Sequence, residues 1–308
     1  MEKNTREKHA GGHTVDLKTV GECNRCLDVE TLHPQATLID LSRPDPLHEA
    51  VKFEFYAVLL IEDCPGGCVC CGRRYYDYGN ATMVFLAPGG VFRLSAEGAF
   101  PAKGWLLAFR PELLSPSFAC RMLDYSFFHY RKEEALHLSQ RETGIITCCL
   151  EHIDAELHHP IDGHTATILS RQIELMLDYC ARYYERQFIT RENKNRVLME
   201  RLRTLVDEGL STGLCGSVVV APRPEPLAGS LALSPAYLLD LLKFETGQTL
   251  AQYVSLRRLE QAKRLLQEAG ASPAAVARRL GYPSTQFFSA LFKKVTGVAP
   301  ADYRHSLN

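Results

Sequence analysis

The sequence has 308 residues and lacks a long apolar run. Its longest apolar stretch, FYAVLLI, is far shorter than the roughly 20 residues that cross a bilayer as a helix. The amino terminus, MEKNTREKHAGGHTVD, carries charges but no apolar core of the kind found in secretory signals. We therefore expect a cytoplasmic protein that does not contact a membrane.

Catalytic and metal-binding motifs are also missing. No histidine occurs between Glu49 and Phe128, so the apolar half of the N-terminal region cannot supply a site of two or three His with a carboxylate. The chain has no assembled nucleophile, no phosphate-binding glycine loop and no His-Glu-x-x-His motif. These absences predict a protein that is not an enzyme and needs no cofactor.

Cysteine, by contrast, is plentiful. Eleven cysteines are present, an odd number, and without an export signal they favour reduced thiols. Cys64, Cys68, Cys70 and Cys71 cluster in DCPGGCVCCG, and soft thiolates of this kind bind metals or act as redox switches. Their spacing fits no standard zinc site, and neighbouring strand residues point to opposite faces. We favour a structural role and keep thiol or metal sensing open.

The net charge of −1 hides an asymmetry between the two halves of the chain. Residues 191–308 hold 16 Lys and Arg against 10 Asp and Glu, a net +6, whereas residues 1–190 hold 19 against 26, a net −7. A basic C-terminal domain next to an acidic N-terminal one points to a polyanion as the partner of residues 191–308.

Residues 1–35 are polar and have an uncertain order, and residues 36–138 contain short apolar runs separated by turn residues. The runs ATLIDL, FEFYAVLLIED, ATMVFLAPGGVFRL and GWLLAFR are rich in β-branched and aromatic residues, which predicts strands in a small barrel or sandwich. Side chains inside such a domain are candidates for lining a small-molecule pocket. They are Tyr76, Tyr78, Phe85, Arg93 and Trp105.

Residues 139–190 show helical periodicity in two segments joined by HHPIDG, which predicts an antiparallel helical pair. The predicted apolar stripe comprises Ile145, Cys148, Cys149, His152 and Ile153 in the first helix, and Ile168, Gln172, Leu175, Leu177, Tyr179 and Tyr183 in the second. Either a buried core or a dimer interface explains such a stripe. The polar segment ITRENKN is expected to link this pair to the C-terminal domain.

Residues 191–308 contain the same unit twice. Residues 227–247 and 276–297 each read as a short helix, a turn, and a longer helix that ends in Thr-Gly, with a 50-residue offset. A helix over 249–268, roughly 30 Å long, joins them. This arrangement predicts two helix-turn-helix units that place their second helices about one DNA turn apart.

The second helix of each unit has two distinct faces. In the later unit, Phe288, Leu291, Phe292 and Val295 are predicted to be buried, and Ser284 to cap the helix. The opposite face carries Gln286, Ser289, Ala290 and Lys293, which suit a base edge and a phosphate. In the earlier unit Ser234 is the expected cap. The outward residues there are Ala236, Leu239, Asp240 and Lys243.

Two segments carry a resemblance to a known family. SPAYLLDLLKFETGQTLAQYVSLRRLEQAKRLLQ and VARRLGYPSTQFFSALFKKVTGVAPADYR resemble the DNA-binding domain of AraC/XylS transcription regulators over about residues 196–305. YDYGNATMVFLAPGG and GWLLAFRPELL look like the sensor half of a Bacteroidetes-type branch. The resemblance implies a multidomain α+β chain with a cupin-like β-barrel, a helical pair used for dimerisation, and an all-α tandem helix-turn-helix domain.

The resemblance also implies site residues. The family's base-contacting positions fall on Ala236, Leu239 and Asp240, and on Thr285, Gln286 and Ala290. Gln286 is the strongest single candidate, because Leu239, Asp240 and Ala290 depart from the family's usual Gln or Arg. Candidates for contact with the DNA backbone, beside the two caps and Lys243, are Arg257, Arg258, Lys293 and Lys294.

The function that follows is sequence-specific binding of double-stranded DNA by a homodimeric transcription regulator. By resemblance it is a ligand-responsive activator that works with RNA polymerase, and its effector is an unknown small molecule. Two alternatives stay open, a regulator that senses thiols or metals through the cysteine cluster and a DNA-binding dimer that responds to no ligand.

Overall fold

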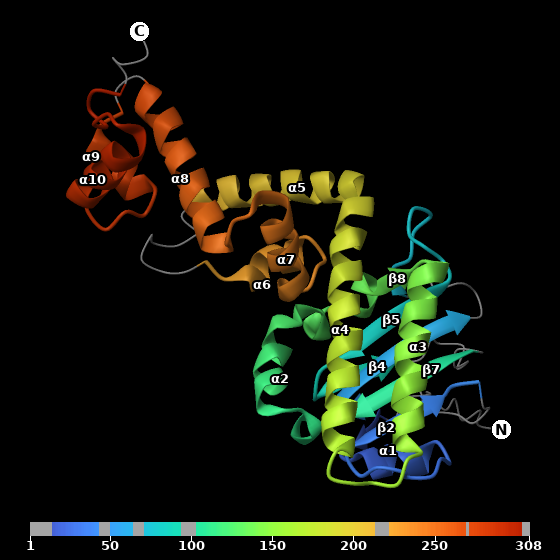
Figure 1. Cartoon of the computed structure of the whole chain (residues 1–308). Helices are drawn as coiled ribbons and strands as arrows, with labels where there is room; N and C mark the ends of the chain where they lie inside the picture. The colour runs from blue at the N-terminus through green and yellow to red at the C-terminus, as the bar shows by residue number, and fades with distance from the viewer. Residues whose placement is uncertain are drawn as a thin grey trace, which may run out of the picture. The chain divides into compact units, whose positions relative to one another are not determined.

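The computed structural model (Figure 1) describes residues 14–42, 50–63, 71–93, 103–212, 222–268 and 271–303. Cys64, Cys68 and Cys70 lie outside these residues. The chain divides into two compact units, Met1–Thr190 and Arg191–Asn308, and each is described by itself.

The N-terminal unit contains two sheets. The larger has the strand order β2-β7-β4-β5-β8, and the smaller has the order β1-β3-β6. Pairing is antiparallel except between β1 and β3, which are parallel. The strands are β1 (Thr14–Leu17), β2 (Ala36–Asp40), β3 (Ala50–Phe53), β4 (Tyr56–Asp63), β5 (Ala81–Leu86), β6 (Gly90–Arg93), β7 (Lys103–Phe109) and β8 (Leu136–Leu138).

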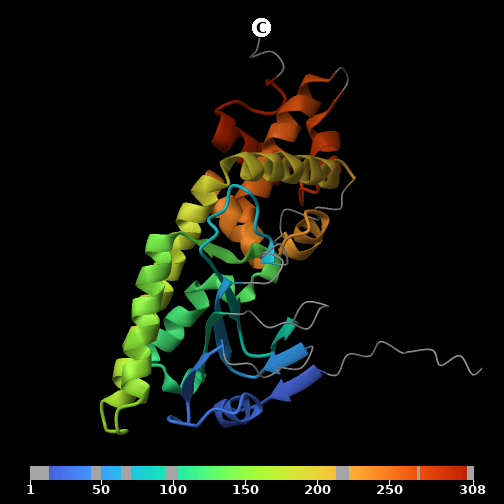
Figure 2. The same cartoon turned by 90° about the vertical axis from the view of Figure 1, so that its right-hand side faces the viewer.

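The five-stranded sheet forms the middle layer of the unit, and Figure 2 shows the long helices α3 (Gln140–Leu157) and α4 (Thr165–Thr190) on one of its sides and the smaller sheet on the other. Alternating side chains of β4 divide between these layers. Val58 and Leu60 join the core beneath the helices, whereas Leu59 and Ile61 join the core shared with the smaller sheet. This two-sided burial explains why β4 reads as a continuous apolar run in the sequence.

The expected cupin-like barrel is not confirmed, because the described strands form two sheets rather than one closed sheet. After the turn at Gly89, which has φ 86°, β6 pairs with β3 in the smaller sheet instead of continuing the larger one. The mixed α+β class is as predicted. Closure depends on strand register and shear, which short apolar runs do not encode.

Two long helices cover the larger sheet, α3 (Gln140–Leu157) and α4 (Thr165–Thr190). Ser139 and Glu142 form a capping box at the start of α3. The buried face of each helix differs from the predicted stripe, because the sheet packs against the face next to it. Ile146 and Leu169 are buried in place of Ile145 and Ile168. Of the predicted stripe, Cys148, His152, Ile168 and Leu175 are exposed, while Cys149, Ile153, Leu177 and Tyr183 are buried.

Shorter elements complete the N-terminal unit. They are α1 (Val20–Cys26), α2 (Pro116–Arg121) and the 3-10 turns η2 (Pro111–Leu113), η3 (Met122–Asp124), η4 (Ser126–His129) and η5 (Lys132–Glu134). Within the predicted lead-in, residues 14–35 contain β1, which pairs with β3, and α1.

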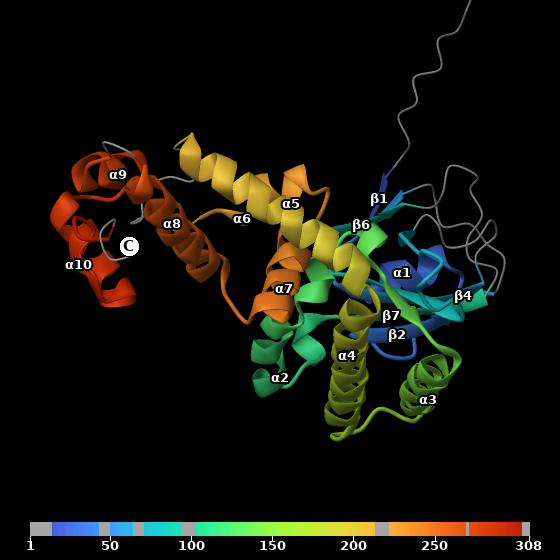
Figure 3. The same ribbon diagram turned by 90° about the horizontal axis from the view of Figure 1, so that it is seen from above.

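The C-terminal unit is helical throughout its described residues. Its helices are α5 (Glu192–Ser211), α6 (Pro224–Ser230), α7 (Pro235–Thr246), α8 (Leu250–Gln267), α9 (Pro273–Arg279) and α10 (Thr285–Thr296). Figure 3 shows α8 running from the α6–α7 pair to the α9–α10 pair. The expected polar linker is a single residue, Arg191, because α4 ends at Thr190 and α5 begins at Glu192.

Among the described residues no single helix is long and apolar enough to cross a membrane. The bent pair of α6 and α7 has the length and composition of a span only when its two helices are taken together.

Candidate nucleic-acid interface

The first helix-turn-helix unit consists of α6 and α7, which are bent by 90° relative to one another. This angle is the one that such a motif requires. Ser234 accepts a hydrogen bond from the backbone N–H of Tyr237, and Pro235 occupies the first helical position. The turn holds Ala232 in the left-handed region, with φ 56°, and Gly247 ends α7 with φ 69°. The local sequence therefore fixes both the start and the end of α7.

The second unit, α9 and α10, repeats these devices. Ser284 caps α10 by accepting from the N–H of Phe287, and Gly297 ends the helix with φ 80°. Gly281 has φ 70° in the turn, where the first unit has Ala232. In both units the final threonine donates its hydroxyl to the carbonyl four residues earlier, at 2.7 Å. The repeat seen in the sequence is thus a repeat of structure.

The core of the second unit holds α10 in place. Phe288 and Phe292 are fully buried and pack together, with ring centroids 5.5 Å apart. Tyr282 lies 4.9 Å from Phe288, and Tyr303 lies 5.1 Å from Phe292. The prediction for Val295 was wrong, because this side chain is 54% exposed.

The outward face of α10 carries the residues predicted to meet DNA. Gln286, Ala290, Lys293 and Lys294 are exposed, whereas Thr285 and Ser289 are half-buried. Phe287, which was not predicted as a site residue, is 46% exposed beside Gln286. An amide, two cations and apolar surface therefore lie on one face, and these groups suit a base edge, phosphates and a thymine methyl group.

The outward face of α7 differs in chemistry. Leu239 is 38% exposed and Phe244 is 42% exposed, and Lys243 is also exposed. Ala236 and Asp240 are half-buried. Phe244 occupies the position that Lys294 has in the second unit, so α7 offers apolar surface where α10 offers a cation.

Two candidate backbone contacts, Arg257 and Arg258 of α8, are engaged inside the domain. Arg257 donates to Asp207 of α5, with Nε 3.0 Å from Oδ1, and this hydrogen bond raises the pKa of the guanidinium. Arg258 is 3% exposed and donates to the carbonyl of Leu280 at 3.1 Å. This burial does not favour the predicted contact of Arg258 with the DNA backbone, and both arginines join helices to each other.

Sequence reasoning also missed two cations. Arg278 and Arg279 lie in the last turn of α9, and both are exposed. The sequence could have indicated them. This pair of arginines ends the first helix of a repeated unit and adds to the same excess of positive charge as Lys293 and Lys294. The first unit has Gly229 and Ser230 there.

The thiol hypothesis finds little support in the described residues. No group of three or more His, Cys, Asp or Glu there is arranged to hold a metal ion. Cys71, the one member of the cluster within these residues, is buried. Burial raises the pKa of Cys23 to about 12, which keeps this thiol protonated at neutral pH and unreactive.

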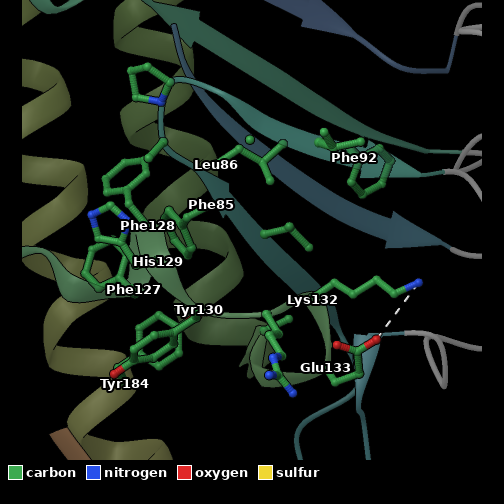
Figure 4. A pocket seen from close by; sticks show the side chains of 17 residues that line it. Phe85, Leu86, Phe92, Phe127, Phe128, His129, Tyr130, Lys132, Glu133 and Tyr184 are labelled. Carbon is green, nitrogen blue, oxygen red and sulfur yellow. Dashed lines mark ion pairs between the residues drawn. The ribbon is translucent and has the colours of Figure 1, made fainter. Parts of the chain in front are cut away.

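The N-terminal unit contains a cavity of about 530 Å³ beside β5, shown in Figure 4. Phe85, Phe127 and Phe128 contribute aromatic rings, and the Phe85 and Phe127 centroids are 4.5 Å apart. Tyr184 of α4 stacks on Phe127 at 5.3 Å and donates to the carbonyl of Glu134 at 3.3 Å. The remaining lining residues are Val84, Leu86, Ala87, Pro88, Gly90, Val91, Phe92, His129, Tyr130, Arg131, Lys132, Glu133 and Ala135.

Only Phe85 of the predicted pocket residues lines this cavity. Trp105 lines a second, smaller one of about 350 Å³. Tyr78 is 44% exposed and packs under Arg186 at 4.7 Å, and Tyr76 contacts Tyr75. The side chain of Arg93 lies outside the described residues. The signal that marks the true lining is the aromatic and basic run SFFHYR, residues 126–131.

Comparison with known proteins gives matches to regulators. Residues 227–306 match the family model described as a helix-turn-helix domain. Similar proteins include YijO, an uncharacterized HTH-type transcriptional regulator of Escherichia coli K12, which is 25% identical over 71% of this chain and 74% of its own. A putative AraC-like transcription regulator of Streptomyces lividans is 38% identical over 25% of this chain, and the match spans only 26% of that protein.

Among solved structures, the C-terminal domain of AraT, a response regulator from Geobacillus stearothermophilus, is 29% identical. The match covers 35% of this chain and 84% of the AraT domain, with a TM-score of 0.29. That score is too low to support an inference about the whole fold.

Proposed function

The chain belongs to the AraC/XylS family of transcription regulators, and we propose that it binds specific DNA sites chiefly through its second helix-turn-helix unit. The charges of the two units carry this proposal. The α9–α10 pair has four cations and no acidic residue, whereas the α6–α7 pair has one cation and three acidic residues. Attraction to phosphate supplies much of the affinity of such proteins, so the cationic unit binds first and more tightly.

The first unit then contributes mainly through apolar contact. Leu239 and Phe244 of α7 present exposed hydrocarbon, which suits the methyl groups of thymine in the major groove. Asp240 opposes phosphate and fits only a base that donates, such as cytosine. The two units are thus unequal readers, with α10 supplying electrostatic anchoring and α7 supplying selection.

The experiment that tests this proposal is selection of the full-length protein on random duplex DNA, with the bound pool sequenced. We expect one well-defined element read by α10 and a weaker element about ten base pairs away read by α7. Binding that depends on salt but enriches no sequence would refute specific recognition.

Gln286 is the residue on which specificity at α10 is expected to depend most. Its exposed amide can pair with an adenine edge through two hydrogen bonds. We expect Gln286→Ala to cost about 1–3 kcal/mol on the selected site and to relax preference at one base position. Fluorescence anisotropy on a set of single-base variants measures this. Equal losses on every variant would show that Gln286 does not read a base.

We propose further that the protein is a homodimer joined through the outer stripe of α4, formed by Ile168 and Leu175. The two residues are seven apart, the repeat of a coiled-coil seam. Ile168 is 40% exposed and Leu175 is 47% exposed on the side of α4 that does not join the core. Exposed apolar side chains at this spacing favour a second copy of the helix as their partner.

Substitution of Leu175 tests the dimer. Leu175→Glu places a charge in the stripe, and we expect it to weaken dimerisation about 30-fold or more, since an unpaired buried charge costs several kcal/mol. Sedimentation equilibrium measures the dissociation constant. Leu123→Glu is the matched control, because Leu123 is 86% exposed and lies outside the stripe on η3. Equal behaviour of the two variants would place the interface elsewhere.

The regulatory role completes the proposal. A dimeric DNA-binding protein with an N-terminal cavity is suited to activate transcription with RNA polymerase in response to a small molecule. Such a response requires that the effector bind two arrangements of the protein with different affinity. Transcription in vitro from the selected site, with and without effector, distinguishes an activator from a repressor.

A further inference from the structure

We propose that the cavity beside β5 binds a small organic anion with a flat, unsaturated body. This inference deepens the ligand response proposed above by assigning it a site and a chemical class. The volume of the cavity, about 530 Å³, lies within the range of small-molecule sites, which is roughly 300–1,000 Å³.

The apolar part of the cavity is built for a planar group. Phe127 is stacked between the ring systems of Phe128, at 5.4 Å, and Tyr184, at 5.3 Å. Tyr130 stands edge-on to Tyr184 at 5.2 Å. Aromatic rings prefer offset stacking and edge-to-face contact with other rings, so this group of side chains favours a flat ligand over a flexible chain. Leu86 and Val91 contribute an aliphatic wall to the lining.

The rim of the cavity is cationic. Arg131 and Lys132 line it, and both are exposed. Among the described residues of the lining the one acid is Glu133, whose Oε1 lies 4.0 Å from Nζ of Lys132. Figure 4 marks this ion pair with a dashed line. One acid leaves an excess of positive charge at the mouth. A carboxylate matches the planar guanidinium of Arg131, which donates two parallel hydrogen bonds.

The cavity also lies next to the last turns of α4. The segment that forms its rim anchors the last turns of α4. Gln187 donates to the carbonyl of Ala135 at 3.0 Å and accepts from the N–H of His137 at 2.8 Å. Because Tyr184 lines the cavity, an occupant contacts α4, the helix that ends at Thr190.

The test is titration calorimetry of the full-length protein, without DNA, using 1-naphthoate and its neutral counterpart 1-naphthamide. We expect one naphthoate per chain, bound about tenfold more tightly than the amide because of the charge-assisted hydrogen bonds. The Arg131→Gln/Lys132→Gln variant should lose this preference. Leu86→Trp, which fills the cavity from its aliphatic wall, should weaken both probes about tenfold or more.

A matched control and a competitor sharpen the test. Arg171→Gln removes an exposed cation of α4 that does not line the cavity, and it should leave both affinities unchanged. Absence of saturable naphthoate binding, or a preference for the anion that survives the double variant, would overturn the assignment. Tighter binding of decanoate than of 1-naphthoate would contradict the proposed preference for a flat ligand. Because DNA is absent, failure here is distinct from failure of DNA recognition.

Discussion

Phe288→Ala is expected to destabilise the second helix-turn-helix unit by about 3–5 kcal/mol, the cost of removing a large buried aromatic side chain. Phe288 is fully buried and contacts Tyr282 and Phe292 through their rings. Loss of this side chain leaves a cavity between α9 and α10, and α10 no longer holds its outward face in one orientation. Chemical denaturation followed by circular dichroism measures the change in the free energy of unfolding.

The same substitution should abolish specific DNA binding if α10 is the principal reader. Val295→Ala is the control, because Val295 lies on the same helix and was predicted from periodicity to be buried with Phe288. It is 54% exposed, so its truncation should change stability by less than about 0.5 kcal/mol. A large loss at Val295, or a small one at Phe288, would contradict the packing of α10.

Val295 shows what helical periodicity can and cannot predict. The 3.6-residue repeat correctly placed Phe288 and Phe292 on the buried face. It does not say how far along a helix its partners extend, and so it carried the buried face on to Val295. The capping residues and terminal glycines are local signals, and for this reason the sequence predicted the bounds of α7 and α10 well.

The helices α3 and α4 show a different limit. Both have neighbouring apolar residues, such as Ile145 with Ile146 and Ile168 with Leu169, so that two faces compete for burial. The sheet selected one face, and the other remained exposed on α4 as the outer stripe. Which of two apolar faces is buried depends on where the sheet lies in the folded unit, and the sequence of the helix does not contain that information. The four apolar runs predicted strands, but they did not indicate that β6 pairs with β3 in the smaller sheet.

The candidate interface was predictable in part for the same reasons. Gln286, Lys293 and Lys294 are exposed as expected, because a helix surface follows from a local repeat. Arg257 and Arg258, which were predicted as phosphate contacts, are held inside the unit by partners that lie 50 and 22 residues away. A pair of arginines in the sequence carries no mark of an acidic residue or a carbonyl that folding brings close to it.

The second large effect is on the salt dependence of DNA binding. It distinguishes basic residues that contact phosphate from those whose side chains are held inside the protein. Lys293→Ala/Lys294→Ala should reduce the slope of log affinity against log salt by about 2, because each phosphate contact contributes ~0.9 through counterion release. At ~0.15 M salt this amounts to a loss of roughly 30-fold on every sequence alike. Both lysines are exposed, so the free energy of unfolding should not change. Anisotropy titrations at several salt concentrations give the slope.

Arg257→Ala provides the contrasting result. Its guanidinium is held by Asp207, and the side chains of the pair are only 16% and 24% exposed. Removing one partner of a hydrogen-bonded, largely buried ion pair costs about 1–3 kcal/mol of stability, most of it from the carboxylate left behind. The salt slope should stay at the wild-type value, since no phosphate contact is lost. A slope that falls by about 1 on Arg257→Ala would mean that the arginine exchanges Asp207 for DNA when the complex forms, and α5 would then be released from α8 by binding.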